Sequence, residues 1–367
     1  MNAGILKEPA FEARVSFLPE HLSSLKKLAE KINVETGAGH KAFAADEQYI
    51  NAGASIMNRE QVIRESDILF CMHLPGEEDM EHLSSKVIVG NYQPYYNMES
   101  IQTLARNNIT AFSLDMIPRT TRAQSMDILS SQANIAGYKA VIIAANIFPK
   151  YFPMFMTAAG SIAPAKVLIL GAGVAGLQAI ATARRLGAVV EVFDTRPAVK
   201  EEVQSLGAKF IEVEGAADPS SAGGYAVQQT EDFLQRQKQK IADAVAKADI
   251  VITTAQIHRK KAPLLINEEM INKMKHGSVI IDLASATGGN TALTRDKQTI
   301  TTGGITIVGD SHLAATMPAD ASKLYGKNIL NFLHLVVDAQ GNFNLNMDDD
   351  LVKGTCICSG GNLLLQK

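Results

Sequence analysis

The sequence predicts an α/β fold with two Rossmann-like parallel-sheet domains, and three observations support this prediction. Short apolar runs alternate with helical patterns along most of the 367 residues, which is typical of parallel sheets. One run, Val167 to Leu170, leads into a glycine-rich turn, a helix and a second apolar run. A long helical pattern from Arg122 to Phe148 separates this unit from an earlier α/β unit. We therefore expect two domains joined by long helices, with a cleft between them.

The first domain is predicted to be discontinuous, comprising residues 1–131 and 312–367. The helical stretch Ala321–Val337 and the tail from Phe343 contain no second glycine fingerprint, and we expect them to return and cover this domain. The expected strands are Ala3–Leu6, Asp67–Cys71, Val87–Val89 and Ile109–Phe112, with helices at Leu22–Ile32 and Met98–Ala105.

The second domain is predicted to span residues 132–311. Beyond the glycine-rich unit its expected helices are Ala198–Leu206 and Thr230–Ala246, and its expected strands are Lys209–Val213, Asp249–Thr254, Ser278–Leu283 and Ile305–Val308. The segment Glu214–Tyr225 is rich in Gly, Ala, Ser and Asp and is expected to be a loop. A loop of this length in a compact α/β domain is usually either functional or disordered.

Composition excludes several classes of protein. The net charge is −3 and basic residues are scattered apart from His258–Lys261, so we expect no nucleic-acid partner. No apolar run reaches the roughly 20 residues that a membrane-spanning helix needs, and we expect no signal or transit peptide. Three cysteines indicate a reducing compartment. Cys356 and Cys358 are expected to face the same side of a strand as ordinary thiols, with no metal site.

The glycine-rich turn has the sequence of a dinucleotide-binding fingerprint in its full structural context. Gly171 allows the tight turn, Gly173 allows backbone to approach a diphosphate, and Gly176 allows the helix to pack closely on the strand. The diphosphate would lie at the helix N-terminus, where unpaired N–H groups and the helix dipole favour an anion. Glycine-rich turns also occur without a ligand, but the surrounding strand–helix–strand pattern favours nucleotide binding.

The end of the next strand predicts which nucleotide binds. Asp194 follows the apolar run Val189–Phe193, where a carboxylate accepts hydrogen bonds from the adenosine ribose. Its charge would repel a 2′-phosphate, so NAD is favoured over NADP. Arg196 leaves an alternative open, because its guanidinium would either pair with a 2′-phosphate or form a salt bridge to Asp194.

A second informative stretch runs from Met116 to Gln132. Pro118 and two threonines form a loop, and Thr121 is expected to cap the long helix. Hydrogen-bonding groups are concentrated in this turn, and the pattern alone is equally compatible with a solvated helix start that contains an Arg–Asp pair. The groups are Arg119, Arg122, Gln124, Ser125, Asp127 and Ser130.

Longer motifs extend the argument beyond local patterns. The segments PRTTRAQSMDILSSQANIAGYKA and FPMFMTAAGSIAPAKVLILGAGVAGLQAIATARRLGA, followed by VFDTRP, SAGGYA, DIVITTA, GSVIIDLA, GGN and a final GTC, cover nearly the whole chain. Together they resemble the NAD(H)-binding component of proton-translocating NAD(P) transhydrogenase, within the alanine dehydrogenase/transhydrogenase superfamily. The segment from Arg119 to Gln132 is far more specific than the glycine fingerprint.

The resemblance implies a set of site residues. Arg119 and Asp127 would hydrogen-bond the nicotinamide carboxamide, Gln124 would reach towards the nicotinamide ribose and the partner cofactor, and Ser130 would support them. The same loop contributes Thr120, Thr121, Ser125 and Met126. The adenosine side would be lined by Val174, Asp194, Thr195 and Arg196, with Gln256 near the adenine, and a mobile loop containing Gly224 and Tyr225 would close on the nucleotide.

The resemblance also implies the reaction and the partners. Hydride would pass from NADH on this chain to NADP⁺ on a partner subunit, so positioning and not acid–base chemistry would be the protein's main contribution. A membrane-spanning subunit would couple the transfer to proton translocation. The chain would be a homodimer, cytoplasmic and associated peripherally with the inner membrane through these partners.

Two alternatives remain open. Alanine dehydrogenase shares the two-domain fold and an early Lys-Glu followed by Arg, here Lys7, Glu8 and Arg14, but it also needs a lysine and a histidine in the first domain. Here the matching lysine is missing, and His73 is a candidate base only by default. A regulatory NAD-sensing module is the non-enzymatic alternative.

One loop departs from the family pattern. Where the family has Ile-Pro-Gly and a basic residue, this chain has Ile257 followed by His258, Arg259, Lys260 and Lys261. These cations would either contact an acidic partner surface or be solvated.

Overall fold

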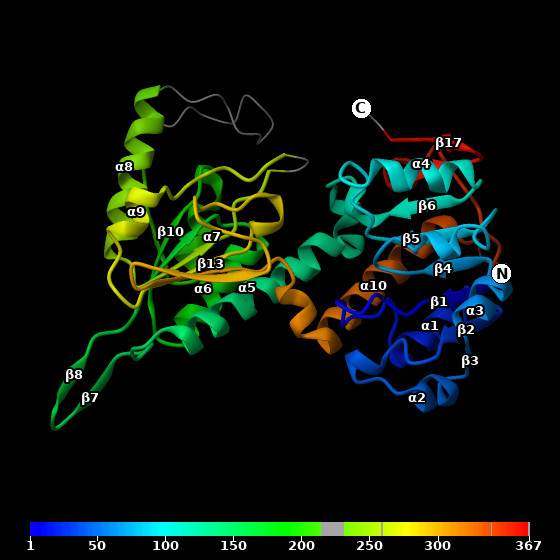
Figure 1. The fold of residues 1–367 in the computed structure, drawn as a ribbon, viewed down its shortest axis with the longest axis horizontal. Coiled ribbons are helices and arrows are strands. Elements are labelled where there is room, and N and C mark those ends of the chain that lie inside the picture. The colour runs from blue at the N-terminus through cyan, green and yellow to red at the C-terminus, as the bar shows by residue number, and fades with distance from the viewer. Residues whose placement is uncertain (214–230, 258–259, 339, 366–367) are drawn as a thin grey trace. The chain divides into compact units, whose positions relative to one another are not determined.

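The computed structural model describes residues 1–213, 231–257, 260–338 and 340–365 (Figure 1). The chain divides into two compact units, residues 1–132 with 314–367 and residues 133–313. Each unit is built on its own largely parallel sheet, and hydrophobic clusters pack on both faces of each sheet. The predicted α/β class, with two parallel-sheet domains of which the first is discontinuous, is confirmed.

The first unit contains an eight-stranded sheet in the order β17-β16-β6-β5-β4-β1-β2-β3. Strands β1 to β6 are parallel, and β16 and β17 add an antiparallel edge. The strands are β1 Asn2–Ile5, β2 Lys31–Glu35, β3 Ser55–Met57, β4 Ile68–Phe70, β5 Val87–Gly90, β6 Thr110–Ser113, β16 Cys356–Ser359 and β17 Asn362–Leu363. The helices are α1 Leu22–Leu25, α2 Asp46–Asn51, α3 Arg59–Glu65, α4 Met98–Arg106, α10 Pro318–Val336 and α11 Asp350–Thr355.

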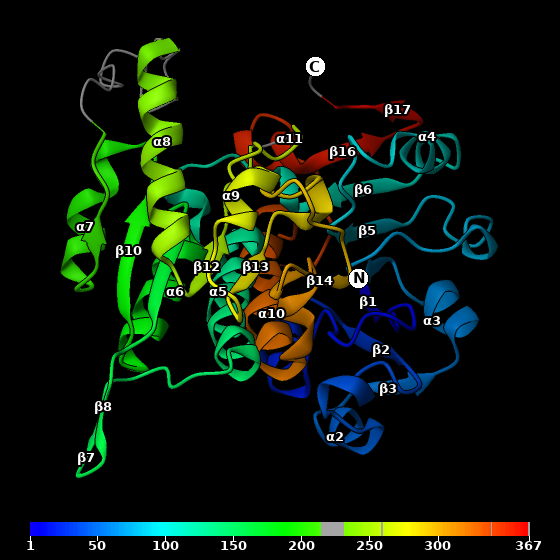
Figure 2. The same ribbon diagram turned by 60° about the vertical axis from the view of Figure 1, so that its left-hand side comes forward.

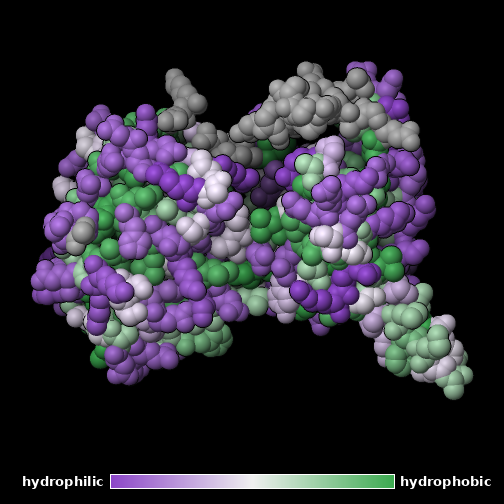
Figure 3. Space-filling view, turned by 180° about the vertical axis from the view of Figure 1, so that it is seen from behind, coloured by the Kyte–Doolittle hydropathy of each residue, from purple (hydrophilic) through white to green (hydrophobic). Residues whose placement is uncertain are grey.

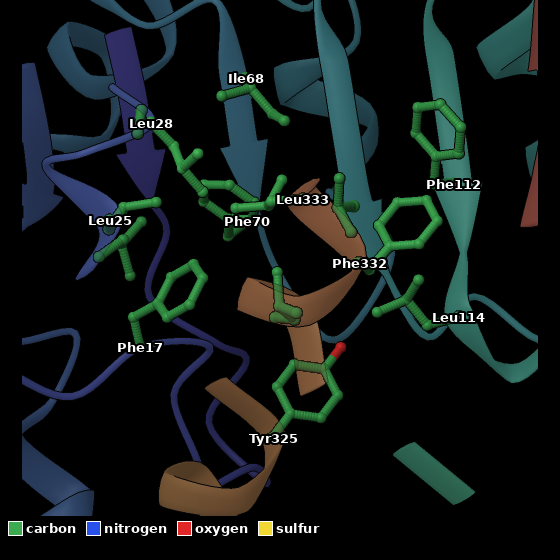
Figure 4. Close-up of a cluster of buried hydrophobic side chains, with 14 of the residues drawn as sticks. Phe17, Leu25, Leu28, Ile68, Phe70, Phe112, Leu114, Tyr325, Phe332 and Leu333 are labelled. Carbon is green, nitrogen blue, oxygen red and sulfur yellow. The ribbon is translucent and has the colours of Figure 1, made fainter. Parts of the chain in front are cut away.

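Both faces of this sheet are covered by apolar helix faces. Helices α1, α10 and α11 pack on one face, and α3 and α4 pack on the other. Figure 4 shows the α10 side, where Phe332 meets Phe112 edge-on at 5.3 Å between ring centroids and Phe17 meets Phe70 at 4.8 Å. The C-terminal strands β16 and β17 lie beside β6 in Figure 2.

Two predictions in the first unit are wrong. The expected helix Leu22–Ile32 ends at Leu25, because Glu30 already donates its N–H to the carbonyl of Met1 and the chain enters β2 at Lys31. Several strands and short helices of this unit were also not predicted.

The two neighbouring cysteines were expected on one side of a strand, and this expectation is also wrong. Cys356 pairs with Phe112 and Cys358 with Ala111, so two steps along β16 match one step along β6. This β-bulge turns the two thiols into different hydrophobic clusters on opposite faces of the sheet.

The second unit contains a seven-stranded sheet in the order β11-β10-β9-β12-β13-β15-β14. All strands are parallel except the edge strand β14, which was not predicted. The strands are β9 Lys166–Leu170, β10 Val189–Phe193, β11 Lys209–Phe210, β12 Ile250–Thr253, β13 Val279–Asp282, β14 Gln298–Thr302 and β15 Ile305–Gly309. The parallel strands follow the dinucleotide-binding order 3-2-1-4-5-6, which reverses between β9 and β12.

Helices cover both faces of this second sheet as well. The helices are α5 Ile128–Ile147, α6 Val174–Arg185, α7 Lys200–Ser205, α8 Glu231–Lys247 and α9 Glu268–Asn272. Helices α5, α6 and α7 pack on one face and α8 and α9 on the other. Gly137 brings α5 against α6, because a Cβ there would lie 2.1 Å from the carbonyl oxygen of Ala175.

The predicted helix Arg122–Phe148 is divided in two, with a 3₁₀-helix η5 over Thr121–Met126 followed by α5 from Ile128. The break is at Asp127, whose carboxylate accepts hydrogen bonds from the N–H and hydroxyl of Ser130 and so caps α5. The expectation that Thr121 caps this helix is therefore wrong.

A hairpin of β7 Phe155–Thr157 and β8 Gly160–Ile162 forms a separate two-stranded sheet (Figure 1). Within the described ranges, no helix is both long enough and apolar enough to cross a membrane. No group of three or more His, Cys, Asp or Glu residues in the same ranges is arranged to hold a metal ion.

Candidate functional site

The glycine-rich turn lies where β9 ends and α6 begins, at the point where the strand order reverses. Gly171 has a φ of +107°, which side-chain-bearing residues rarely adopt, and its N–H donates to the carbonyl of Phe193. A Cβ on Gly176 would lie 1.9 Å from the carbonyl oxygen of Gly171. These two glycines therefore allow the turn and the close approach of helix to strand.

Gly173 differs from its neighbours because it opens onto free space. It is the N-cap residue of α6, and a Cβ there would meet no described atom within 4 Å. The first N–H groups of a helix have no partner within the helix and attract anions. The space beside Gly173 is where a diphosphate would approach them, and Val174 next to it is 40% exposed.

Asp194 links the end of β10 to the glycine-rich turn. Its carboxylate accepts the N–H of Ala172 at 2.7 Å, and Arg196 donates to it through its backbone and both sides of its guanidinium at 2.8 to 3.0 Å. Burial alone would raise the pKa of Asp194, but the hydrogen bonds from Arg196 and Ala172 outweigh burial and lower it. Of the two roles left open for Arg196, the structure shows the salt bridge.

The loop after β12 is held at the same edge of the sheet. Thr254 donates its hydroxyl to the carbonyl of Gly171 at 3.0 Å. Asn290 is buried and uses both ends of its amide on Ala255, accepting from the N–H at 3.1 Å and donating to the carbonyl at 2.9 Å. Gln256, which follows, donates to the carbonyl of Leu283 at 3.0 Å. The sequence did not single out Thr254 or Asn290, although Asn290 belongs to the GGN motif.

The segment from Arg119 to Ser130 belongs to the first unit. The side chains of Arg119, Thr120, Thr121, Gln124 and Ser125 are exposed, whereas Met126 is buried in the core cluster beneath them.

Arg122 makes an ion pair, but not with Asp127. It pairs with Asp349 and Asp350 at the start of α11. Asp127 instead binds Ser130, with its carboxylate 2.6 Å from the hydroxyl. The segment therefore presents a row of exposed polar groups on a buried anchor.

A buried polar cluster lies beyond the ends of β1 and β4, where the strand order of the first sheet reverses. Glu12 accepts two side-chain hydrogen bonds from Arg14 at 2.6 and 2.9 Å, and its carboxylate is 3.0 Å from Nε2 of His73. Burial would raise the pKa of Glu12, but these partners hold it far below its usual range. Arg14 also donates to Gln132 at 2.8 Å.

Glu8 accepts the N–H groups of Met72 and His73 in the same cluster. Its burial outweighs these bonds and raises its pKa to about 7.

The predicted site residues fall into separate groups. Gly171, Gly173, Gly176 and Asp194 converge at the carboxyl edge of the second sheet, with Gln256 on the neighbouring loop and Thr195 exposed beside Asp194. Gly224, Tyr225, His258 and Arg259 lie outside the described residues.

The fold and this edge define a two-domain protein of the dinucleotide-binding class. The chain belongs to the alanine dehydrogenase/PNT family, whose N-terminal domain matches residues 4–136 and whose C-terminal domain matches residues 140–366.

The similar proteins include transhydrogenase subunits. The chain is 44% identical over 360 residues to the first of the polypeptides that make up NAD(P) transhydrogenase subunit alpha in Rhodospirillum rubrum, covering 95% of this chain and 94% of that protein. A solved transhydrogenase from Sinorhizobium meliloti is 42% identical and superimposes with a TM-score of 0.91, covering 99% of this chain and all of that one. Alanine dehydrogenase from Staphylococcus haemolyticus is 27% identical over 294 residues, covering 79% of this chain and 73% of that protein.

The unequal surroundings of the glycines give a testable contrast. Gly173→Ala should leave the free energy of unfolding nearly unchanged, because its Cβ meets no described atom within 4 Å, yet weaken NADH binding by about tenfold by obstructing the diphosphate. Gly176→Ala should destabilise the protein, because its Cβ would lie 1.9 Å from a carbonyl oxygen. Chemical denaturation and NADH fluorescence titration measure the two effects. Unchanged NADH affinity in folded Gly173→Ala would contradict this assignment.

Proposed function

We propose that this chain is the NAD(H)-binding subunit of a proton-translocating NAD(P) transhydrogenase. It holds NADH while hydride passes to NADP⁺ bound on a partner subunit, and a membrane-spanning partner couples the transfer to proton movement. The observation that carries the proposal is the glycine-rich turn joined to Asp194, in a chain 44% identical to a transhydrogenase alpha subunit along nearly its whole length.

The adenosine half of NAD(H) fits the second unit. The open N-cap at Gly173 accommodates the diphosphate, and the Asp194 carboxylate, ionised because its pKa is lowered, accepts from the ribose hydroxyls. Val174, Thr195 and Gln256 complete this side. Arg196 already neutralises part of the Asp194 charge, so it is an internal partner and not a free phosphate ligand.

The nicotinamide half is assigned to the segment 119–130. Arg119 and Asp127 hold the carboxamide, Gln124 extends towards the partner's cofactor, and Ser130 orients Asp127 through the bond already present between them. Thr120, Thr121, Ser125 and Met126 shape the loop, and Gly224 and Tyr225 belong to the segment that closes on the nucleotide. The nicotinamide supplies the hydride, so the side chains here have to orient and not to exchange protons.

The polar cluster argues against the alanine dehydrogenase alternative. Arg14 is the residue that would bind a substrate carboxylate, but its charge is already matched by the buried carboxylate of Glu12. Glu12 has 0% of its side-chain surface exposed, and separating a buried pair costs about 3–5 kcal/mol. His73, the default base, lies 3.0 Å from the same carboxylate.

Hydride transfer to a partner tests the function directly. Mixed with a purified NADP(H)-binding transhydrogenase domain, the chain should transfer hydride from NADH to thio-NADP⁺, and it should not reduce NAD⁺ with alanine. Gln124→Asn should slow the transfer about tenfold while NADH affinity stays nearly constant, because a shortened side chain alters alignment more than binding. NADH binding without transfer would instead favour the NAD-sensing module, and alanine oxidation would favour the dehydrogenase.

Nucleotide selectivity tests the role of Asp194. The chain should bind NADH at least about tenfold more tightly than NADPH, and Asp194→Asn should narrow that ratio by removing the charge while keeping an oxygen for the Ala172 N–H. The sequence contains no tryptophan, so cofactor fluorescence reports binding directly. Asp249→Asn, in the same unit, is the control and should leave the ratio unchanged. Equal affinities in the unmodified chain would rule out the argument.

The hairpin β7–β8 supports the proposal of a homodimer. It exposes Met154, Phe155, Met156 and Ile162, which are 41 to 72% accessible, and Tyr151 stacks on Phe155 at 5.1 Å. In the space-filling view the hairpin projects as a largely hydrophobic arm (Figure 3). An isolated two-stranded hairpin is at best marginally stable in water, so this arm is suited to pack against a second copy of the chain.

A charge on the hairpin should therefore disrupt the dimer. Met156→Asp places a carboxylate on a residue that is 72% exposed in the single chain and should shift the mass measured by sedimentation from about twice 39.4 kDa towards 39.4 kDa. Leu264→Asp, 62% exposed in the same unit, is the control and should leave the mass unchanged. A Met156→Asp protein of undiminished mass would exclude the hairpin as the contact.

A further inference from the structure

Two asparagines on α10 converge on one backbone carbonyl of the segment 119–130. Asn328 and Asn331 donate their side-chain N–H groups to the carbonyl oxygen of Ser125, at 2.8 and 3.0 Å. They are three residues apart on the helix and so share a face. Ser125 precedes Met126, the last residue of the 3₁₀-helix η5, where carbonyls lack partners within the helix.

Asn328 also binds the other side of the break in the chain. Its side-chain oxygen accepts the hydroxyl of Ser131 at 2.7 Å, so one amide spans from Ser125 in η5 to Ser131 in α5. Asp127, which separates the two helices, lies between these anchor points. Asn328 is only 8% exposed, and both of its hydrogen-bonding directions are used, so its orientation is defined.

These contacts set the position of exposed residues from below. Met126 is buried against the core that includes α10, whereas Gln124 and Ser125 are exposed. The segment thus has one apolar anchor at Met126 and one polar anchor at the Ser125 carbonyl. Without the polar anchor, Met126 would still hold η5 to the core, but the backbone that carries Gln124 and Asp127 would be free to shift.

We propose that Asn328, assisted by Asn331, is a positioning residue for hydride transfer that sets the placement of Gln124 and Asp127 without contacting the nucleotide. This inference rests on the proposed function of the segment 119–130. A displacement of about 1 Å caused from outside a site can cost about a hundredfold in rate, so removing the anchor should affect transfer far more than binding.

The test compares the unmodified chain with Asn328→Asp, Asn331→Ala and Asn107→Asp. Asn328→Asp keeps an oxygen for Ser131 but turns a second oxygen towards the Ser125 carbonyl, replacing a donor by an acceptor. Asn107 likewise donates to a backbone carbonyl, that of Thr103, at 3.0 Å in the same unit, so Asn107→Asp is the matched control. Each protein is assayed for NADH affinity by fluorescence and for single-turnover transfer to thio-NADP⁺ on a purified NADP(H)-binding domain.

Asn328→Asp should transfer hydride about tenfold to a hundredfold more slowly, with NADH affinity within about twofold of the unmodified chain. Asn331→Ala, which retains the Asn328 bond, should show a smaller loss in the same direction, and Asn107→Asp should show none. Transfer at the normal rate in Asn328→Asp, or equal losses in Asn328→Asp and Asn107→Asp, would overturn the positioning role. If Asn328→Asp does not fold, Asn331→Ala decides by the same comparison of rate with affinity. Absence of transfer by the unmodified chain would instead refute the proposed function.

Discussion

The second unit depends on one close approach, that of the start of α6 to the end of β9. The carbonyl oxygen of Gly171 occupies the space where a Cβ of Gly176 would be, so only glycine allows the helix to begin this near the strand. Because of that approach, the helix N-terminus points across the carboxyl edge of the sheet, and Asp194 reaches the N–H of Ala172. The turn, the helix dipole and the ribose-binding carboxylate therefore form one connected arrangement.

The first unit repeats the strand order of the second but uses the reversal point differently. Its strands β3, β2, β1, β4, β5 and β6 follow the same order, yet the space beyond β1 and β4 is filled by Glu12, Arg14 and His73 bonded to one another. Charges that satisfy one another in this way have little capacity left for a ligand. Two sheets of one topology thus have one edge open to a nucleotide and one edge closed by an internal ion pair.

The sequence predicted the elements whose signals are local. Glycine spacing and the following Asp194 located the nucleotide edge, and apolar runs located most strands of both sheets. Prediction was less accurate where distant residues compete: α1 ends early because Glu30 bonds to Met1, and η5 separates from α5 because the Asp127 carboxylate caps the second helix. Asn290 and Asn328 could not be recognised because their importance arises from loops about 35 and 203 residues away in the chain.

The β-bulge that separates Cys356 from Cys358 affects how this protein can be studied. Each thiol lies in a different hydrophobic cluster, and burial raises their pKa values to about 12 and about 11. Burial likewise raises the pKa of the third cysteine, Cys71, to about 12. All three sulfurs therefore remain protonated and shielded from reagents at neutral pH. A cysteine introduced on the surface would be the only reactive thiol, so a spectroscopic label can be attached at a chosen position without first removing the native residues.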